Sequence, residues 1–303
     1  MRAIVDIETD AINATKIHCI VARNAETGET RHWIGDQCRE FGEWSKKIDT
    51  FIMHNGISFD APLLNKFTGS DIKVNQIDDT LIKSQLYNPI RDGGHSLEAW
   101  GNFLGHKKGD YHDFSHFNQE MLRYCYIDTA VTMETYNYLK EEGKKFSEKS
   151  YDLEREVRSI VDKQQKNGFA FNIMKGMTLE ARLMDELYSL EEKAHDMFPP
   201  TIVELKTKTK EIPFNIASRK QIADRLMKKG WKPTKKTDKG NIIVNEAVLD
   251  TINMPEAKMF SRYFLLQKRT GLLKAWIQAC SEKERVHGRV MTLKTITGRM
   301  AHH

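Results

Sequence analysis

"IVDIETD", residues 4–10, predicts the first strand of the chain and raises the question of what its acidic residues do. Ile4, Val5 and Ile7 give the segment the apolar content of a buried β-strand. Asp6 and Glu8 are two residues apart, so in a strand both carboxylates leave the same face. The segment alone leaves two interpretations open: a solvated outer face, or a face that holds acidic groups for chemistry.

Length and composition predict an intracellular protein of two domains. The 303 residues are 40% hydrophobic, which is ample for globular cores, and no apolar run reaches the ~18 residues typical of a membrane span. The N-terminus runs straight into the first strand without the layout of a signal peptide. The four cysteines are scattered, with no Cys-x-x-Cys pair and no zinc-like histidine spacing, as expected of a reduced chain without structural zinc.

The charge is distributed unevenly along the chain. Residues 1–148 contain 17 Lys and Arg against 23 Asp and Glu, whereas residues 149–303 contain 30 against 19. A basic half is typical of proteins that meet phosphate backbones. An acidic half that must meet the same polyanion is expected to hold cations of its own.

Hydrophobic periodicity predicts an α/β first half and a helical second half. Strand signals at 4–8, 16–24 and 51–55, a hairpin over 26–35 and helical signals at 59–67, 95–105 and 118–143 favour a mixed-sheet α/β domain. Beyond residue 149 the strand signals fade, and helices are predicted over 150–168, 174–197, 218–230 and 256–282. A strand-like segment over 285–303 ends the chain.

Two further acidic positions follow ordered patterns. In "HNGISFD" (54–60) Asp60 follows a strand at the start of a helix, and in "YCYID" (124–128) Tyr124 and Asp128 lie one helical turn apart. Taken singly, Asp60 is a helix cap and Tyr124–Asp128 a surface pair. His112 and His116 are also four apart, but with no nearby carboxylate at helical spacing they are predicted to be surface residues.

Together these segments resemble the three motifs of the DnaQ-like (DEDD) 3′–5′ exonucleases, in the subtype that carries a tyrosine, whose fold is similar to ribonuclease H. "IDDTLIKSQL" (77–86) and "HSLEAWGNFLGHKKGDYHDF" (95–114) extend the resemblance to the proofreading domain of family A DNA polymerases of the short-tailed-phage branch. The resemblance implies that Asp6, Glu8 and Asp128 hold one ion of an Mg²⁺ or Mn²⁺ pair. It also implies that Asp6 bridges to the second ion, that Asp60 supports this ion through water, and that Tyr124 orients the attacking water.

Carboxylate chemistry agrees with this expectation. Two carboxylates ~4 Å apart repel by roughly 4 kcal/mol at an effective dielectric of ~20, so four together require cations. Oxygen ligands suit Mg²⁺ or Mn²⁺ rather than zinc. Two such ions would activate water and stabilise the leaving 3′-oxygen. By the same resemblance, Asn55 and Phe59 are expected to line the channel for a single-stranded 3′ end.

The second half resembles the thumb and the palm entry of the same polymerases, in family order. The resemblance is carried by "VDKQQKNGFAFN" (161–172), "FNIASRKQIADRLMKKGWKPTKKTDKGN" (214–241), "YFLLQKRTGLL" (263–273) and "RVHGRVMTLKTITGRMAHH" (285–303). Between positions 206 and 239 there are 12 basic residues against 3 acidic ones. Such a run is typical either of a solvated face or of a tip that grips DNA phosphates without reading sequence. Residues expected to contact primer–template DNA are Lys228, Lys229, Lys235, Lys236, Lys294 and Arg299.

The expected domains are an exonuclease over 1–145, a thumb over 150–284 and the start of a palm over 285–303. The resemblance ends at "TGRMAHH", so these residues are expected to lack a polymerase active site and not to polymerise alone. The sequence leaves open a subunit of a split polymerase, for which a second chain would supply palm and fingers, and the product of an interrupted gene. The phage branch often carries a thumb insertion for thioredoxin. The roughly 15 residues from Pro199 to Pro213 are too short for it, so no thioredoxin partner is expected.

Two rival functions stay open at this point. One is a catalytically idle DNA-binding subunit of a split polymerase, in which the exonuclease fold only holds a partner. The other is an RNA-trimming nuclease of the same superfamily. The complete acidic set argues against the first rival, and the thumb-like second half argues against the second.

Overall fold

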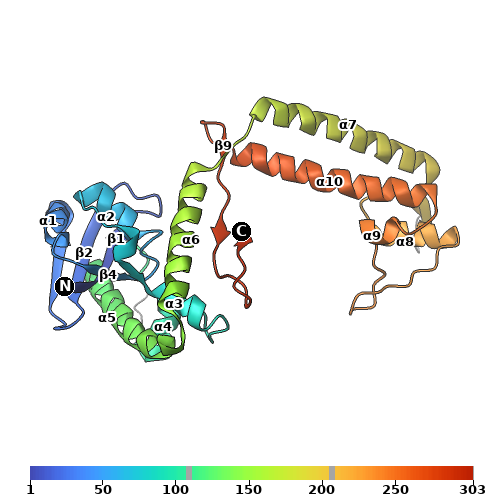
Figure 1. Cartoon of the computed structure of the whole chain (residues 1–303). Helices are drawn as coiled ribbons and strands as arrows, with labels where there is room; N and C mark the ends of the chain where they lie inside the picture. The colour runs from blue at the N-terminus through green and yellow to red at the C-terminus, as the bar shows by residue number, and fades with distance from the viewer. Residues whose placement is uncertain (107–110, 205–208, 303) are drawn as a thin grey trace. The chain divides into compact units, whose positions relative to one another are not determined.

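The computed structural model describes residues 1–106, 111–204 and 209–302, which form two compact units (Figure 1). The first unit comprises Met1–Asn167 and Gly288–His303, and the second comprises Gly168–His287. Helix α6 (Glu148–Asn167) lies in the first unit, where Tyr151 is buried in the core. The compact units therefore divide the chain at other positions than the predicted limits 1–145, 150–284 and 285–303.

A five-stranded mixed sheet forms the centre of the first unit, in the order β3-β2-β1-β4-β5. The strands are β1 (Arg2–Thr9), β2 (Ile17–Asn24), β3 (Thr30–Ile34), β4 (Thr50–Met53) and β5 (Ile77–Asp79). The first three are antiparallel, because short turns join them, whereas β1, β4 and β5 run parallel. The predicted mixed-sheet α/β fold is confirmed.

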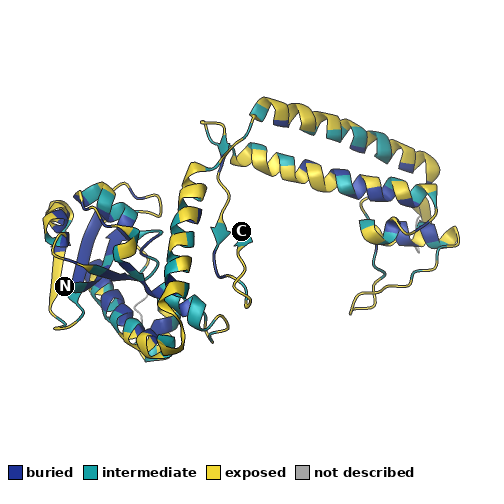
Figure 2. Cartoon of the chain, in the orientation of Figure 1, coloured by how far each residue is buried: buried dark blue, intermediate teal, exposed yellow. Residues whose placement is uncertain are grey.

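Helices cover both faces of this sheet (Figures 1 and 2). On one face, Val5 and Ile7 of β1 pack with Leu64 of α2. On the other face, Val21 of β2 packs with Met121 of α5. The helices of this unit are α1 (Phe41–Ser45), α2 (Asp60–Thr68), α3 (Thr80–Tyr87), α4 (Leu97–Leu104), α5 (Gln119–Glu142) and α6, with 3-10 turns η1 (Gly35–Glu40), η2 (Val74–Gln76) and η3 (Gly143–Lys145).

Side-chain caps fix where the principal helices begin. The side chain of Asp79 accepts hydrogen bonds at the start of α3, that of Ser96 at the start of α4, and that of Asn118 at the start of α5. The predicted helices 59–67, 95–105 and 118–143 are confirmed within one or two residues.

The second unit is mainly helical, as predicted. Its long helices α7 (Ile173–Met197) and α10 (Pro255–Ala279) lie side by side (Figure 1). The shorter helices α8 (Arg219–Lys228) and α9 (Glu246–Leu249) share a core with them, built on Phe198, Phe214 and Phe260. Strand β6 (Phe169–Ala170) pairs with β9 (Arg285–Val286), and β7 (Thr201–Glu204) pairs with β8 (Thr209–Ile212).

The segment from Pro199 to Pro213 is largely this β7–β8 hairpin. Residues 205–208 lie outside the described residues. Two lysines of the basic run, Lys206 and Lys208, and part of the segment considered for thioredoxin fall there. Likewise, residues 107–110 of the "HSLEAWGNFLGHKKGDYHDF" segment lie outside the described residues.

The end of the chain differs from the predicted strand. Beyond β9 it contains only the two-residue strands β10 (Val290–Met291) and β11 (Ala301–His302), within the described residues. Leu293 (φ 52°) and Gly298 (φ 75°) adopt left-handed backbone conformations, which interrupt an extended strand. Gln165 of α6 donates a hydrogen bond to the carbonyl of Val290 (2.9 Å), so this segment is held on the first unit.

Two findings concern the predictions from composition. Among the described residues, no helix has both the length and the apolar character needed to cross a membrane. All four cysteines are free thiols, and three of them are buried.

Candidate metal centre

Asp6 and Glu8 leave the sheet on the face that α5 covers. In the register of β1 with β2, Asp6 lies opposite Val21 and Glu8 lies opposite Cys19, and paired residues share a face. Val21 and Cys19 pack against α5, and Glu8 is only 7% exposed. The interpretation of these carboxylates as a solvated outer face is therefore wrong.

Asp60 reaches the same edge because β4 runs parallel to β1. Ile4 of β1 pairs with Ile52 of β4, and the chain turns from the end of β4 into α2. Beyond this pairing the backbone N–H of Ile7 donates to the carboxylate of Asp60, which is 5% exposed. Phe59 occupies the N-cap position of α2, and Asp60 is the first helical residue, so the simple capping interpretation of Asp60 is wrong.

Asp79 stabilises the loop 54–59, which precedes Asp60, through two hydrogen bonds. Its Oδ1 accepts a hydrogen bond from the N–H of Asn55 (3.1 Å), and its Oδ2 accepts one from the N–H of Ile57 (3.2 Å). Between them, a Cβ at Gly56 would lie 2.3 Å from the Cβ of Met53, so the turn requires glycine. Sequence reasoning missed Asp79, although an aspartate directly before a helical segment is a recognisable capping signal.

Helix α5 brings the third acidic segment across the face of the sheet. Asp128 is 6% exposed, so its interpretation as half of a surface pair with Tyr124 is wrong. Cys125 of the same helix donates hydrogen bonds from Sγ to Oδ2 (3.3 Å) and to the backbone oxygen (3.4 Å) of Asp6. One ligand atom each from Asp6, Glu8 and Cys125 lie within 4.8 Å of one another.

Cys125 is a second residue that sequence reasoning missed. Its position inside "YCYID", three residues before Asp128, was the available signal, because residues three apart share a helix face.

Tyr124 is half-buried one turn before Asp128. Its ring lies 5.8 Å from that of Tyr111 and 6.3 Å from that of Phe114, measured between centroids. The carbonyl of Phe114 is in turn 3.0 Å from Nε2 of His18 on β2. The segment 111–114, which precedes α5, therefore packs against the ring of Tyr124.

The two histidines of the same segment play no part in this centre. His112 and His116 are exposed, as the sequence predicts.

Burial and neighbouring carboxylates raise the pKa of two residues of the centre, Asp6 and Asp60. Burial raises the pKa of Asp6 well above its usual value, and the charges of Asp128, Glu8 and Asp60 act in the same direction, while the Cys125 hydrogen bond opposes them. Burial also raises the pKa of Asp60 to about 7, with backbone N–H donors opposing and the charges of Asp79 and Asp128 adding to the rise.

Such a set fits hard divalent cations. Mutual repulsion of roughly 4 kcal/mol per close pair disappears when a cation lies among the oxygens. Carboxylate oxygens are also the ligands that Mg²⁺ and Mn²⁺ prefer. Asp6, Glu8, Asp60 and Asp128 are the residues that would hold these ions.

The residues of the first unit that are predicted to contact DNA lie in different surroundings from one another. Asn55 and Lys294 line a cavity of about 250 Å³. Phe59 is half-buried and packs against the hydrophobic core of the first unit. Arg299 is exposed in the turn that follows Thr295.

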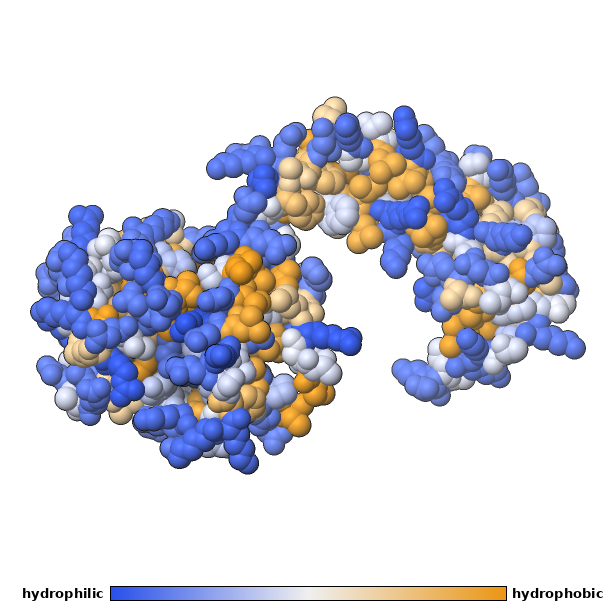
Figure 3. All heavy atoms as spheres, viewed as in Figure 1, coloured by the Kyte–Doolittle hydropathy of each residue, from blue (hydrophilic) through white to orange (hydrophobic). Residues whose placement is uncertain are grey.

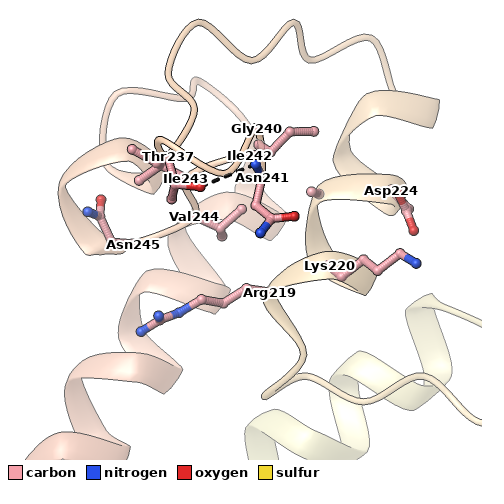
Figure 4. A pocket seen from close by; sticks show the side chains of 11 residues that line it. Arg219, Lys220, Asp224, Thr237, Gly240, Asn241, Ile242, Ile243, Val244 and Asn245 are labelled. Atoms are coloured by element: carbon pink, nitrogen blue, oxygen red, sulfur yellow. Dashed lines mark hydrogen bonds between the residues drawn. The ribbon is translucent and has the colours of Figure 1, made fainter.

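In the second unit the predicted lysines differ in their surroundings. All four are exposed, and Lys229 also forms an ion pair with Glu256 of α10. Arg219 and Lys220 of α8 line a cavity of about 560 Å³ together with the loop 237–245 (Figure 4).

The surface of this unit is uneven in polarity. An apolar strip follows the α7–α10 pair (Figure 3), where Met174, Met177, Leu272 and Trp276 are exposed. Lys228 ends α8, and Lys235 and Lys236 lie on the segment that follows it, away from this helix pair in sequence.

Known proteins resemble the chain over most of its length. The DNA-directed DNA polymerases of Escherichia phage T7 and Enterobacteria phage T3 are 24% and 23% identical to it over 431 aligned positions. Each alignment covers 98% of this chain and 61% of the phage protein, so the chain spans about three fifths of these relatives.

The fold is similar to a solved structure, the POL domain of Pol1 from M. smegmatis in complex with DNA primer-template and dNTP. The TM-score is 0.73 at 13% identity, covering 99% of this chain and 50% of that one. The sequence profile of DNA polymerase family A matches residues 176–303, a range that excludes the four carboxylates. The chain is therefore a distant relative of the family A DNA polymerases, related to those of phages T7 and T3.

Proposed function

We propose that the first unit is a ribonuclease H-like, Mg²⁺- or Mn²⁺-dependent 3′–5′ exonuclease that acts on DNA. The observation that carries the proposal is the meeting of Asp6, Glu8, Asp60 and Asp128 from β1, α2 and α5. They come from three segments that are far apart in sequence, and burial together with the charges of neighbouring carboxylates raises the pKa of Asp6 and of Asp60. Buried carboxylates that repel one another are typical of sites that bind cations.

The reaction is hydrolysis of the terminal phosphodiester bond. The oxygen of water forms a bond to phosphorus, and the bond from phosphorus to the 3′-oxygen of the preceding nucleotide breaks. That oxygen takes up a proton and becomes the new 3′-hydroxyl of the strand, and a nucleoside 5′-monophosphate is released. Cations held by the four carboxylates would supply an acidified water and charge compensation on the leaving oxygen. Tyr124, one helical turn before Asp128, would orient that water through its hydroxyl, and the thiol of Cys125 donates a hydrogen bond to Asp6.

We also propose that the second unit holds DNA through phosphate contacts. Lys228, Lys235 and Lys236 are exposed near α8, and such contacts carry affinity without sequence preference. With the relatives being DNA-directed DNA polymerases, the exonuclease would serve as the proofreading activity in DNA replication. Its partners would be the single-stranded 3′ end, the primer–template duplex and a polymerase palm and fingers.

The test uses single-stranded DNA labelled at its 5′ end. With Mg²⁺ the chain is expected to shorten the strand from the 3′ end, and excess chelator should stop the reaction. Asp6→Asn should lower the rate by roughly two orders of magnitude or more, because it removes a charge from the metal centre. The matched control is Asp71→Asn, which removes an exposed carboxylate of the same unit.

Three results would count against the proposal. Undiminished hydrolysis in chelator, or by Asp6→Asn, would remove the metal centre from the reaction. DNA binding without any hydrolysis would favour the idle DNA-binding subunit. Faster removal of nucleotides from an RNA strand of the same sequence would favour an RNA-trimming nuclease.

A further inference from the structure

A second polar site lies in the first unit, beside the loop that delivers Asp60. It is the cavity of about 250 Å³ that Asn55 and Ser58 line from this loop, Arg158 from α6 and Thr292 from the C-terminal segment. Ser58 is two residues from Asp60, so the cavity adjoins the candidate metal centre along the chain. A single water occupies about 30 Å³ in the liquid, so the cavity has room for a small polar group with its hydration.

Three polar atoms of this cavity are buried and lack a hydrogen-bond partner among the described residues. They are Oε1 of Gln85, Nε of Arg158 and Oγ1 of Thr292. Thr292 is only 2% exposed. Buried polar groups in proteins are nearly always paired, so three orphans in one cavity indicate a missing polar ligand. Arg158 and Thr292 supply donors, and the amide of Gln85 supplies one in its alternative orientation.

The charges around the cavity favour an anion. Arg158, Arg289 and Lys294 line it, against the single carboxylate of Asp162. Asp162 already accepts a hydrogen bond from the hydroxyl of Ser58 (2.6 Å). A guanidinium beside hydroxyl donors is the arrangement that suits phosphate oxygens.

We infer that this cavity binds a phosphate group, through Arg158, Thr292 and Gln85 with Arg289 and Lys294 at its rim. The inference rests on the proposed exonuclease function for the origin of the phosphate. That group is either a phosphodiester of the strand whose 3′ end lies in the metal centre, or the phosphate of a free nucleotide. In both cases it lies beside the loop 54–59, where it would hold the ligand close to Asp60.

Arg158 has one other possible role, as an internal counter-charge. Its positive charge lowers the pKa of Asp79, which burial raises. This role explains a cation at position 158, but it does not explain why the hydroxyl of Thr292 is buried without a hydrogen-bond partner. Thr292→Val separates the two roles, because it removes the hydroxyl, keeps the shape of the side chain and leaves Arg158 in place.

The experiment measures binding by the full 303-residue chain in chelator, where no metal-dependent hydrolysis occurs. The probes are a single-stranded oligodeoxynucleotide, thymidine 5′-monophosphate and inorganic phosphate. Arg158→Gln is expected to weaken binding of the strand by about tenfold and to lower the log–log salt slope by about 0.7. Lys163→Gln is the matched control, since Lys163 is exposed on α6 and lies outside the cavity.

Thr292→Val should weaken the same binding several-fold while raising the melting temperature, because the variant no longer buries an unpaired hydroxyl. Competition by the monophosphate and by phosphate, sensitive to the same variants, would identify a free phosphate group as the ligand. Strand binding that is sensitive to the variants but not displaced by these small anions would identify a phosphodiester.

The site is overturned if Thr292→Val binds every probe as the unchanged chain does. That result decides the matter even if Arg158→Gln fails to fold. Because all binding is measured in chelator, the outcome is independent of whether the metal centre hydrolyses DNA. If the chain binds the probes through Arg158 and Thr292 but never cleaves DNA, the phosphate site is supported and the exonuclease proposal is rejected.

Discussion

The thiol of Cys125 donates a hydrogen bond to Oδ2 of Asp6 over 3.3 Å, which joins α5 to β1 at the centre of the acidic cluster. Burial raises the pKa of this thiol well above its usual value, and its hydrogen bond with Cys19 and the charge of Asp6 act in the same direction. The thiol therefore stays protonated and remains a donor. It is the interaction that favours the charged form of Asp6 against burial and three neighbouring carboxylates.

Cys125→Ala should shift the acid limb of the pH–rate profile to higher pH. The variant removes the donor, so the pKa of Asp6 rises further and protons compete with Mg²⁺ to a higher pH. Cys125→Ser keeps a donor at the same place and should stay near the unchanged profile. Identical profiles for all three chains, measured at saturating DNA, would show that the thiol does not tune Asp6.

The stability of the metal-free chain should fall as the pH rises from about 5 to about 8. The pKa of Asp60 is raised from 3.8 to about 7, so its contribution is fully present below pH 3.8 and is lost as the pH rises through about 7. Asp6 acts in the same direction. The measurement is the melting temperature in chelator across this range.

Asp60→Asn should flatten this dependence and raise the melting temperature at the upper end of the range, since it removes a buried charge. Added Mg²⁺ or Mn²⁺ should stabilise the unchanged chain most at the higher pH, where the carboxylates are ionised. A chain whose melting temperature rises with pH across this range in chelator would contradict the assigned pKa shifts.

Tyr124→Phe should slow hydrolysis by roughly tenfold or more while metal affinity stays unchanged, because the hydroxyl orients water and does not ligate a cation. Tyr126→Phe is the matched control on the same helix. Its hydroxyl lies 2.7 Å from Nδ1 of His32, on β3. The rates come from single-turnover hydrolysis, and the affinities from Mn²⁺ titration. A large loss of Mn²⁺ affinity in Tyr124→Phe would exclude the water-orienting role.

Joint replacement of Lys228, Lys235 and Lys236 by glutamine should weaken duplex binding and flatten its salt dependence. Removing one lysine–phosphate interaction reduces the log–log slope by about 0.9 on duplex DNA. Lys229→Gln is the control, because Lys229 is already paired with Glu256 and should contribute less. If the triple variant keeps the slope of the unchanged chain, these lysines are a solvated face.

Local patterns in the sequence determined most of the elements and the face on which each acidic residue lies, whereas the resemblance to the exonucleases grouped these residues into one set. Alternation along residues 4–8 places Asp6 and Glu8 on one face of a strand, and a spacing of four places Tyr124 and Asp128 on one face of a helix. These statements need only the period of one element. For the same reason the long helices of both units were predictable from their apolar stripes.

The tertiary structure decided which of these faces meet. Asp60 joins Asp6 because β4 pairs in parallel with β1, and Asp128 joins them because Met121 and Cys125 pack α5 onto β2. The roles of Asp79 and Cys125 likewise exist only across such contacts.

The phosphate-site candidate depends on tertiary packing even more strongly. Its orphan groups, on Gln85, Arg158 and Thr292, come from three distant segments, and no spacing along the chain relates them. Strand register and helix packing are set by the whole core at once. A sequence pattern can therefore state which side chains one element presents, but the burial of apolar surface between elements determines where they gather.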